Sequence, residues 1–516
     1  MTQLFAAYLR SGFDFENLGV GRLKSFIEQN NEQIQVTYLD INDNIENNMQ
    51  SVILENKLFG FSMYNDNMEF FVNIINEIKR LKPDAIIVVG SKFVSLYYKE
   101  ILGKFDNIDL AILGDGEKAL LYLIKSINKN NDIELISLKH ENIASKRNAD
   151  EKHPAILNIK ELPWPDRSWM KEIKNKYHYH ALICDSQGCT GTCSFCTRNN
   201  YYTKWSGRFP EDIYNEIIEI NNEFGVRWFF FTSSSFEDSG TAGKEKIKKL
   251  CLLLKENNKN FSFSCYLRAN TFKNTNEDIK LLKLMRSSGF KLVIVGIESG
   301  NEEDLIIYNK HTSVDENKLT LKLLTEAGIY AQTIGFIMLN PYTTRTKLTL
   351  NYKFLCEFGI GSIARFVKKL RVHTQTEIYD RVKKDGLITC EGSYNQIGEC
   401  LYEFNQPDIE DIDVFISKYL DTAQIKKINA DLETSTNFII SYYEFVENGE
   451  QYKIKMMEIE QRNSELLAEY FFYLYVEFDL IKSKKLLSDM INEYSKNANE
   501  IRTLQLGLYK KLNKQL

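Results

Sequence analysis

Residues 185–196 read Asp-Ser-Gln-Gly-Cys-Thr-Gly-Thr-Cys-Ser-Phe-Cys and hold three cysteines within eight positions, Cys189, Cys193 and Cys196. The segment directly follows a short apolar run from residue 181, which predicts a buried strand. Thiolates in this C-x3-C-x2-C spacing can converge on one soft metal centre. Three protein ligands leave one iron of a 4Fe–4S cluster open, and an open iron can hold a substrate.

The chain has nine cysteines in all. Residues 1–12 lack the charged-then-apolar order of a signal peptide, so we expect a cytoplasmic protein, in which stable disulfides are rare. An odd cysteine count with a tight group of three therefore indicates a metal. Zinc is the alternative metal. It usually takes a fourth Cys or His ligand, which His178 or His180 could supply. The spacing is not the paired C-x2-C of zinc ribbons.

A strand-then-helix rhythm continues from the cysteine segment over residues 181–385. Amphipathic helix candidates, such as Pro210–Phe224, separate the strands. Six such units favour an open, partial (β/α)6 barrel with its chemistry at the carboxyl ends of the strands. The six strand candidates are Ala181–Asp185, Arg227–Thr232, Phe261–Arg268, Lys291–Ile297, Ile329–Ile337 and Ser362–Val367.

Residues 1–130 also alternate strands and helices. Asp84–Gly90 (DAIIVVG) is an apolar, β-branched run ending in glycine, which is typical of a buried parallel strand. A helix is expected over Met68–Leu81. The alternation predicts a doubly wound, Rossmann-like domain with a parallel sheet.

Two further regions complete the expected division. Residues 131–180 are polar and irregular, carry Leu162-Pro-Trp-Pro-Asp166, and are the expected linker. Residues 386–516 are expected to be mainly helical, with helices from Ile409 onward. A chain of 516 residues fits this division, at about 150 residues per domain.

The composition is that of a packed soluble protein, with 43% hydrophobic and 26% charged residues. No apolar run approaches the roughly 20 residues that span a bilayer, so a membrane partner is not expected. The net charge of -5 argues against nucleic acid as a partner. With no basic terminal module, modification of tRNA is a weak alternative.

The cysteine loop resembles that of the radical S-adenosylmethionine (SAM) superfamily. In that family three cysteines hold a 4Fe–4S cluster whose open iron binds the amine and carboxylate of SAM, and one-electron reduction releases a 5′-deoxyadenosyl radical that abstracts hydrogen from the substrate. The resemblance implies that Cys189, Cys193 and Cys196 are the cluster ligands and that Phe195 packs beside the cofactor. It also implies a one-electron reductant of the flavodoxin or ferredoxin type.

The ends of the second and third barrel strands extend the resemblance. Thr232-Ser-Ser-Ser235 stands where the family binds the SAM amine. This segment departs from the Gly-Gly-Glu that is usual in the family. Backbone carbonyls and the hydroxyls of Ser233 and Ser234 would therefore have to bind the SAM amine. Arg268 ends the third strand, where the family often has arginine.

The ends of the fourth and fifth strands match the family too. Gly296-Ile-Glu-Ser-Gly300 is close to the family's G-x-E-S-G. The resemblance implies that Glu298, assisted by Ser299, accepts hydrogen bonds from the ribose hydroxyls of SAM. The resemblance also implies that the segment beginning with Gly335 and Ile337 meets the adenine, mainly through the backbone.

The N-terminal domain resembles the cobalamin-binding subclass of the superfamily. The likeness rests on Gly60-Phe-Ser62, Ile86–Ser91 and Leu113–Glu117, together with the proline-containing linker. No histidine precedes His140, which excludes the histidine ligand that one type of cobalamin module provides. Ser91 replaces the second glycine of a usual Gly-Gly pair. Cobalamin is therefore one interpretation, and a domain kept for structure or substrate docking is the other.

The remaining polar and sulfur-bearing residues are given simpler roles. Lys310 and His311 are expected to be solvated loop residues. Cys390 and Cys400 lie in a glycine-rich stretch after the barrel, where a thiol could return hydrogen to a substrate radical. We expect four cysteines in the core, Cys184, Cys251, Cys265 and Cys356.

The sequence leaves three functions open. The first is epimerisation of a ribosomally made peptide, with Cys390 or Cys400 as the hydrogen donor. The second is a cobalamin-dependent C-methyltransferase, favoured by the N-terminal domain, with a peptide or small-molecule substrate. The third is a non-catalytic docking protein that keeps the barrel. The C-terminal helices could cover the barrel mouth or bind a leader peptide.

Overall fold

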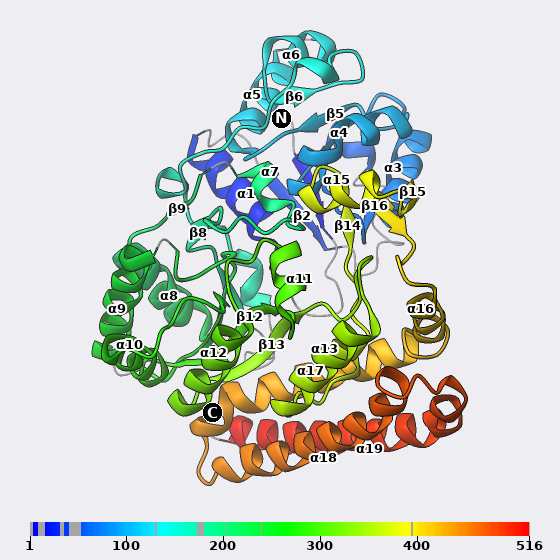
Figure 1. Cartoon of the computed structure of the whole chain (residues 1–516). Helices are drawn as coiled ribbons and strands as arrows, with labels where there is room; N and C mark the ends of the chain where they lie inside the picture. The colour runs from blue at the N-terminus through cyan, green and yellow to red at the C-terminus, as the bar shows by residue number, and fades with distance from the viewer. Residues whose placement is uncertain are drawn as a thin grey trace.

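The computed structural model describes residues 4–8, 16–30, 36–40, 53–129, 132–172, 180–202, 204–238, 240–257, 259–393 and 396–514. Three regions follow one another through the molecule (Figure 1). An N-terminal α/β region lies at the top, a sheet surrounded by helices lies in the middle, and a layer of long helices lies at the bottom.

The N-terminal sheet has the strand order β2-β1-β3-β4-β5-β6. Its first five strands pair in parallel, and β6 runs antiparallel to β5. This confirms the doubly wound domain. The strands are β1 (Leu4–Tyr8), β2 (Val36–Asp40), β3 (Leu58–Ser62), β4 (Ile86–Gly90), β5 (Leu110–Ile112) and β6 (Ile143–Ala144). The helices are α1 (Leu18–Asn30), α3 (Met68–Leu81), α4 (Lys92–Lys104), α5 (Glu117–Asn128) and α6 (Ile133–Lys139).

The sequence patterns explain these elements. The four β-branched residues of β4 are all buried, as expected for a central parallel strand. Helix α3 has the expected bounds and buries Met68, Phe71, Ile75 and Ile78, which recur every three or four residues along one face.

The middle region holds a second parallel sheet, in the order β13-β12-β11-β10-β7. Its strands are β7 (Ala181–Ile183), β10 (Trp228–Phe231), β11 (Ser262–Arg268), β12 (Phe290–Glu298) and β13 (Tyr330–Phe336). The helices are α7 (Arg198–Tyr201), α8 (Pro210–Phe224), α9 (Gly240–Glu256), α10 (Asn276–Ser287), α11 (Glu302–Ile307), α12 (Val314–Ala327) and α13 (Arg345–Glu357). A short ribbon, β8 (Ser186–Gln187) with β9 (Ser206–Gly207), flanks the cysteine segment.

The prediction of a sixth barrel strand over Ser362–Val367 is wrong. Residues 363–366 form helix α14 (Ile363–Phe366) instead. The chain then passes beside the end of β13 and makes one parallel bridge, between Leu339 and Lys369. Ile363 and Phe366 are buried because they form one side of this short helix, and their spacing of three does not distinguish a helical turn from a strand.

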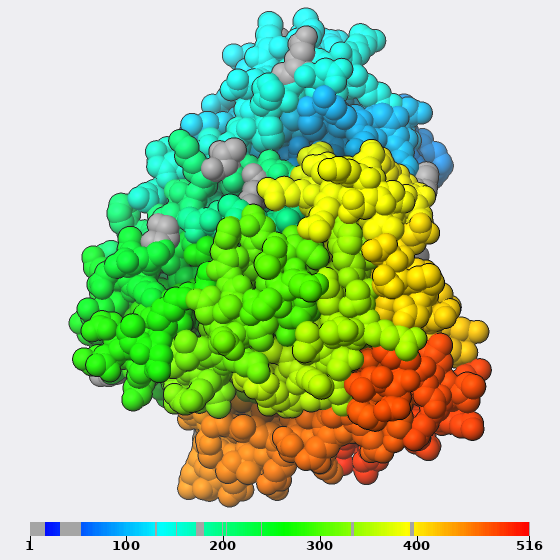
Figure 2. Space-filling model, in the orientation of Figure 1, coloured from blue at the N-terminus to red at the C-terminus, as the bar shows by residue number. Residues whose placement is uncertain are grey.

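The sequence did not predict a small antiparallel sheet after the barrel. It consists of β14 (Val372–His373), β16 (Gln396–Tyr402) and β15 (Ile388–Ser393), with α15 (Glu377–Lys384) between its first two strands in sequence. Gly398, at φ 77°, lies against the ring of Tyr97 on α4. Gln375 Nε2 also donates to Leu96 O of α4, over 3.0 Å. The sheet therefore ties the barrel to the N-terminal domain, and Figure 2 shows its residues, in yellow, between blue and green.

Four helices form the C-terminal layer, as expected: α16 (Pro407–Tyr419), α17 (Ala423–Tyr442), α18 (Glu450–Tyr475) and α19 (Leu480–Lys514). Helix α17 packs against β12. Lys291 Nζ of β12 donates to Ser441 O of α17 over 3.2 Å, and the rings of Trp228 and Tyr442 meet edge to face. This helix thus covers part of the barrel sheet. Among the described residues, no helix is both long and apolar enough to cross a membrane.

Candidate active site

The three cysteines lie on the loop after β7 and β8, at the carboxyl edge of the barrel sheet. All three are half-buried. A Cβ added at Gly191 would lie 3.4 Å from Cys189 Sγ and 4.0 Å from Cys193 Sγ, so these two thiols face the same point. The third thiol, of Cys196, is close enough to Cys193 to affect its pKa. Burial raises the pKa of Cys189 to about 11 and also raises that of Cys193.

One of the two histidines that the zinc alternative needs lies away from the cysteine loop. Among the residues that the structure describes, no three His, Cys, Asp or Glu side chains are arranged to hold a single metal ion. His180 lies at the opposite end of β7, where its ring packs 4.7 Å from that of Trp228, and burial lowers its pKa to about 4. His178 lies outside the described residues. A 4Fe–4S cluster spreads its cysteine ligands over separate irons, so it does not need them around one ion.

Ion pairs anchor the first cysteine to the barrel. Arg268, at the end of β11, binds Glu237 through Nε over 3.0 Å and Asp238 through Nη2 over 2.7 Å. Asp238 in turn accepts from the Thr190 backbone N–H and hydroxyl, next to Cys189. Arg268 is thus engaged in holding the cysteine loop. Sequence reasoning missed Glu237 and Asp238, although only Phe236 separates them from the serine segment.

The loop after α11 holds the other side of the cysteine segment. Ser194 N donates to Tyr308 O over 2.9 Å, and Asn309 Nδ2 donates to Thr192 O over 2.9 Å. His311 Nε2 shares a hydrogen bond of 3.0 Å with Thr192 Oγ1. Phe195 meets the buried ring of Tyr308 at 88°, with centroids 5.6 Å apart.

Glu298 stands at the end of β12 in a strained conformation, with φ 64°, which a non-glycine residue rarely adopts. A Cβ added at Gly296 or at Gly335 would lie 3.0 Å from Glu298 Oε1, so both glycines leave room for this carboxylate. Lys310 Nζ lies 3.5 Å from the same oxygen, and its side chain is only 7% exposed. The expectation that Lys310 is a solvated loop residue is therefore wrong.

Two other residues predicted to contact SAM also have hydrogen-bond partners within the protein. Ser299 is fully buried, and its hydroxyl lies 2.9 Å from Asn351 Oδ1 and 3.3 Å from Asp304 Oδ2. This hydroxyl therefore stabilises the turn after β12 through hydrogen bonds to buried side chains. The backbone N–H of Ile337 donates to Glu298 O over 2.8 Å, which aligns the end of β13 with that of β12.

The serine segment after β10 offers polar atoms near the cysteine loop. Ser234 Oγ donates to Gly188 O over 3.3 Å. Ser233 is buried, and its hydroxyl has no hydrogen-bond partner within the described part of the chain. An unsatisfied buried hydroxyl is costly to keep, and a bound ligand would supply its partner.

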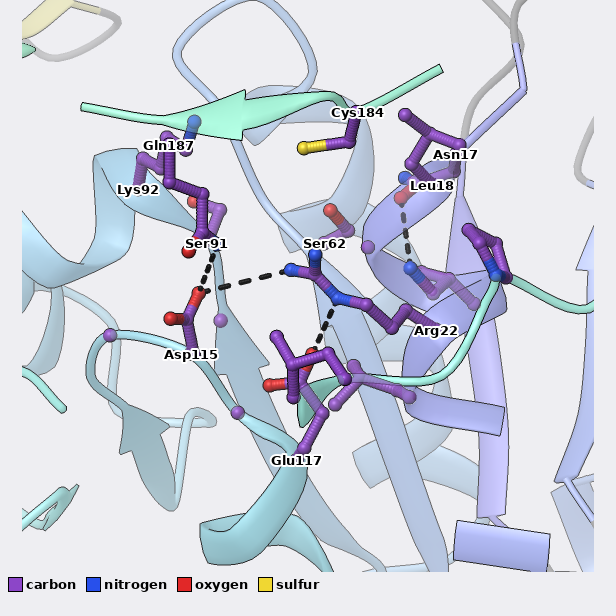
Figure 3. Close-up of a pocket in the computed structure, with 18 of the residues that line it drawn as sticks. Asn17, Leu18, Arg22, Ser62, Ser91, Lys92, Asp115, Glu117, Cys184 and Gln187 are labelled. Carbon is purple, nitrogen blue, oxygen red and sulfur yellow. Dashed lines mark hydrogen bonds and ion pairs between the residues drawn. The ribbon is translucent and has the colours of Figure 1, made fainter. Parts of the chain in front are cut away.

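A cavity of about 450 Å³ lies between the N-terminal domain and the barrel. Its N-terminal side is formed by the carboxyl ends of β3, β4 and β5, where ligands bind in open α/β sheets. Arg22 of α1 crosses it and pairs with Glu117 over 2.7 Å and Asp115 over 3.8 Å (Figure 3). Two buried atoms on its wall, Glu117 Oε2 and Gln187 Oε1, have no hydrogen-bond partner within the described residues.

The Ser91 side chain, which replaces the second glycine of the usual pair, does not obstruct this cavity. Its hydroxyl donates to Met63 O over 2.5 Å and accepts from Val94 N, so it is turned into the N-cap of α4. Lys92 follows and faces the cavity, where burial beside Arg198 lowers its pKa to about 8. The described residues that line the cavity include no histidine.

The cysteines outside the cluster loop also differ from expectation. Cys251 and Cys265 are buried, as predicted. Cys184 is half-buried and lines the cavity between the domains (Figure 3), so it is not a core residue. The stretch that holds Cys390 and Cys400 is not a loop but the pair β15 and β16, where the first thiol is exposed and the second is buried. Neither lines that cavity.

A second cavity, of about 680 Å³, lies between the β12–β13 side of the barrel and helices α17 and α18. It reaches Gly335, beside the Glu298 carboxylate. Asn437 of α17 lines it and is 7% exposed, and its Oδ1 has no hydrogen-bond partner in the described structure. Tyr330 and Glu460 face each other across its wall, with the hydroxyl 2.5 Å from the carboxylate.

Comparison with known proteins identifies both halves of this site. Residues 183–353 match the radical SAM superfamily, and residues 6–124 match the B12 binding domain. The chain therefore combines a radical SAM domain with a B12 binding domain, the combination that defines the cobalamin-binding subclass of the radical SAM superfamily. The radical SAM domain implies a 4Fe–4S cluster and SAM as cofactors, and the B12 binding domain supports cobalamin as a third.

Several curated proteins are similar to this chain. An anaerobic magnesium-protoporphyrin IX monomethyl ester cyclase of Cereibacter sphaeroides is 26% identical over 276 residues, 51% of this chain and 43% of that protein. A 4'-phospho-dehydrooxetanocin synthase of Priestia megaterium is 26% identical over 351 residues, 62% of this chain and 46% of that protein. The chain thus spans about half the length of these relatives.

Solved structures share the fold. The cobalamin-dependent radical SAM enzyme OxsB, with aqua-cobalamin and SAM bound, superposes with a TM-score of 0.74 over 100% of this chain and 80% of that one, at 17% identity. The radical SAM methyltransferase TsrM from Kitasatospora setae superposes with a TM-score of 0.59 over 76% of this chain and 78% of that one, at 16% identity.

The residues present fit both groups. Thiols converging around Gly191 suit a cluster with an open iron. The cavity between the domains is lined by glycines and apolar side chains, and it holds buried amide and carboxylate oxygens without hydrogen-bond partners in the described residues. Such a lining suits a large macrocycle that bears amide side chains. Cys184, Gln187 and Thr232 line this cavity and belong to the carboxyl edge of the barrel sheet, so the two cofactor sites adjoin.

Proposed function

We propose that this chain is a cobalamin-dependent radical SAM enzyme that methylates an unactivated carbon of a small molecule. The observation that carries the proposal is the cavity between the domains, which opens onto the strand ends that hold the cysteine loop. When bound, the cluster would supply the radical through SAM, and the corrinoid would supply the methyl group.

Residues of this chain have distinct roles in the proposal. Cys189, Cys193 and Cys196 bind the cluster, and Arg268 with Asp238 holds the loop that carries them. Glu298 accepts from the ribose of SAM, while the backbone near Gly335 and Ile337 meets the adenine. Ser233 and Ser234 offer hydroxyls to the SAM amine.

The second cavity supports a small-molecule substrate. At about 680 Å³ it is in the range of small-molecule pockets, roughly 300–1,000 Å³. It adjoins the strand end that would hold the nucleoside of SAM. The curated relatives include a cytidylyl-2-hydroxyethylphosphonate methyltransferase of Streptomyces wedmorensis, 21% identical over 406 residues, which also favours a small organic substrate.

Peptide epimerisation would need a hydrogen donor within reach of the substrate radical. Cys390 is exposed on β15, and Cys400 is buried in β16 with a pKa raised by burial to about 11. These placements give epimerisation less support than the cavities give methylation. A non-catalytic docking role would leave both cofactor sites without a purpose.

The first test is spectroscopic. We expect anaerobic reconstitution with iron and sulfide to give the absorption and, after reduction, the EPR signal of a 4Fe–4S cluster, and hydroxocobalamin to remain bound through gel filtration. The Gly90→Phe variant should fill the interdomain cavity and lose the corrinoid while it keeps the cluster. Gly103→Phe is the matched control, since a Cβ there meets nothing within 4 Å. Retention of no corrinoid by the wild type would contradict the proposal.

The second test separates the reactions by their products. Methylation of a C–H carbon consumes two SAM molecules, one giving 5′-deoxyadenosine and the other S-adenosylhomocysteine, and adds one methyl to the substrate. Epimerisation gives 5′-deoxyadenosine and incorporates solvent deuterium with no added methyl. Absence of SAM cleavage under reductant would favour the docking role.

A further inference from the structure

Lys310 is a buried cation close to two parts of the proposed site. These are the Glu298 carboxylate, which would bind the SAM ribose, and the cluster cysteine Cys193. Its side chain is 7% exposed, and Nζ lies 3.5 Å from Glu298 Oε1. The same Nζ lies 3.0 Å from the point where a Cβ at Gly296 would stand, so the ammonium sits directly over the end of β12. Cys193 and Glu298 both stabilise its charged form and raise its pKa against the effect of burial.

The backbone around Lys310 is held rigidly to the cysteine loop. Lys310 N donates to Leu305 O over 3.1 Å, at the end of α11. Its neighbours Asn309 and His311, both with φ 51°, bind Thr192 from either side. The loop therefore fixes the ammonium relative to the cluster cysteines, and a flexible surface lysine would not have this constraint.

We propose that Lys310 is a positioning residue that orients the Glu298 carboxylate for the SAM ribose and places a fixed positive charge beside the cluster thiolate of Cys193. This rests on the proposed function, since it takes the three cysteines as cluster ligands. A buried cation near a cluster favours its reduced, more negative state, because cluster potentials follow local charge and solvent exposure. The lysine thus makes the electron transfer that starts the reaction easier.

The experiment uses the reconstituted full chain and measures the midpoint potential of the cluster by EPR-monitored titration. We expect Lys310→Met to lower the ratio of reduced to oxidised cluster about tenfold at a given potential, which is about 59 mV for a one-electron couple. Lys310→Arg should restore most of this ratio. Lys318→Met, which removes an exposed cation paired with Glu357, should leave the potential unchanged.

A second variant separates electrostatics from loss of structure. Glu298→Gln removes a negative charge at the same place, so the potential should move in the opposite direction to that of Lys310→Met. Both variants should weaken SAM binding, measured by the change that SAM causes in the EPR spectrum. Equal potentials in wild type and Lys310→Met, or shifts of the same sign in the two variants, would overturn the inference. Failure of the wild type to assemble a cluster would instead refute the proposed function.

Discussion

Arg167, in the segment before the barrel, donates through Nη1 to Glu216 Oε1 of α8 over 2.8 Å, and both side chains are almost fully buried. Glu216 also pairs with Arg208, and Arg167 also pairs with Glu16 from the N-terminal domain. Because Glu16 accepts from Leu182 N of β7, this network joins the two domains at the rim of the cavity between them.

We expect Arg167→Met to destabilise the protein by about 3–5 kcal/mol, because it leaves buried carboxylates without their partner. The free energy of unfolding in urea measures this loss. Lys171→Met removes an exposed ion pair with Glu223 of α8 and should change stability by less than about 1 kcal/mol. A similar small loss for both variants would show that the buried network does not join the domains.

Glu16 should make stability depend on pH. Burial raises its pKa from 4.5 to about 7, although Arg167 opposes the shift. Between these two values the unfolded chain releases the proton while the folded chain keeps it, so stability should fall as pH rises through this window and level off above it. Unfolding midpoints from pH 4 to 8 measure the slope. Glu16→Gln should flatten it, and Glu219→Gln, exposed on α8, should leave it unchanged.

Much of the fold could be predicted because its strands are short, apolar and buried, as β4 is. The β14–β16 sheet could not, since Gly392 and Gly398 interrupt its alternation and its stability comes from packing against α4. The sequence of helix α14 resembles that of a strand for a related reason. It is one turn long, and its buried residues recur too few times to reveal a period.

Some residues of the site could likewise be predicted from the sequence, and others could not. Cys189, Cys193 and Cys196 could be singled out because ligand spacing within one loop is a local property. The burial of Lys310 could not, because it depends on how a loop after α11 folds over the cysteine segment, more than one hundred residues earlier. Cys184 looked like a core residue because it follows an apolar strand, but the strand ends before it and the thiol faces the cavity.

Gly335 should matter for SAM binding through the space it leaves. A Cβ there would lie 3.0 Å from Glu298 Oε1 and 3.2 Å from Oε2. We therefore expect Gly335→Ala to displace the carboxylate and weaken SAM binding about tenfold, or about 1.4 kcal/mol, with the fold retained. Equilibrium dialysis with the reconstituted protein measures the affinity. Gly103→Ala, on α4, should stabilise the protein by about 0.5–1 kcal/mol and leave SAM binding unchanged.

We expect Asn437 to lower the stability of the protein while it serves the function of the larger cavity. Its Oδ1 is buried on the wall of the larger cavity with no partner in the described structure, and such a group costs about 1–3 kcal/mol. Asn437→Leu keeps the volume and removes the unsatisfied acceptor, so the midpoint of urea unfolding should rise. If the cavity holds the substrate, the same change should slow substrate modification while SAM binding stays intact. Asn429→Leu, on the same helix, breaks the 2.7 Å bond from the Tyr494 hydroxyl and should instead lower stability. A fall in stability in both variants would mean that Asn437 is an ordinary structural residue.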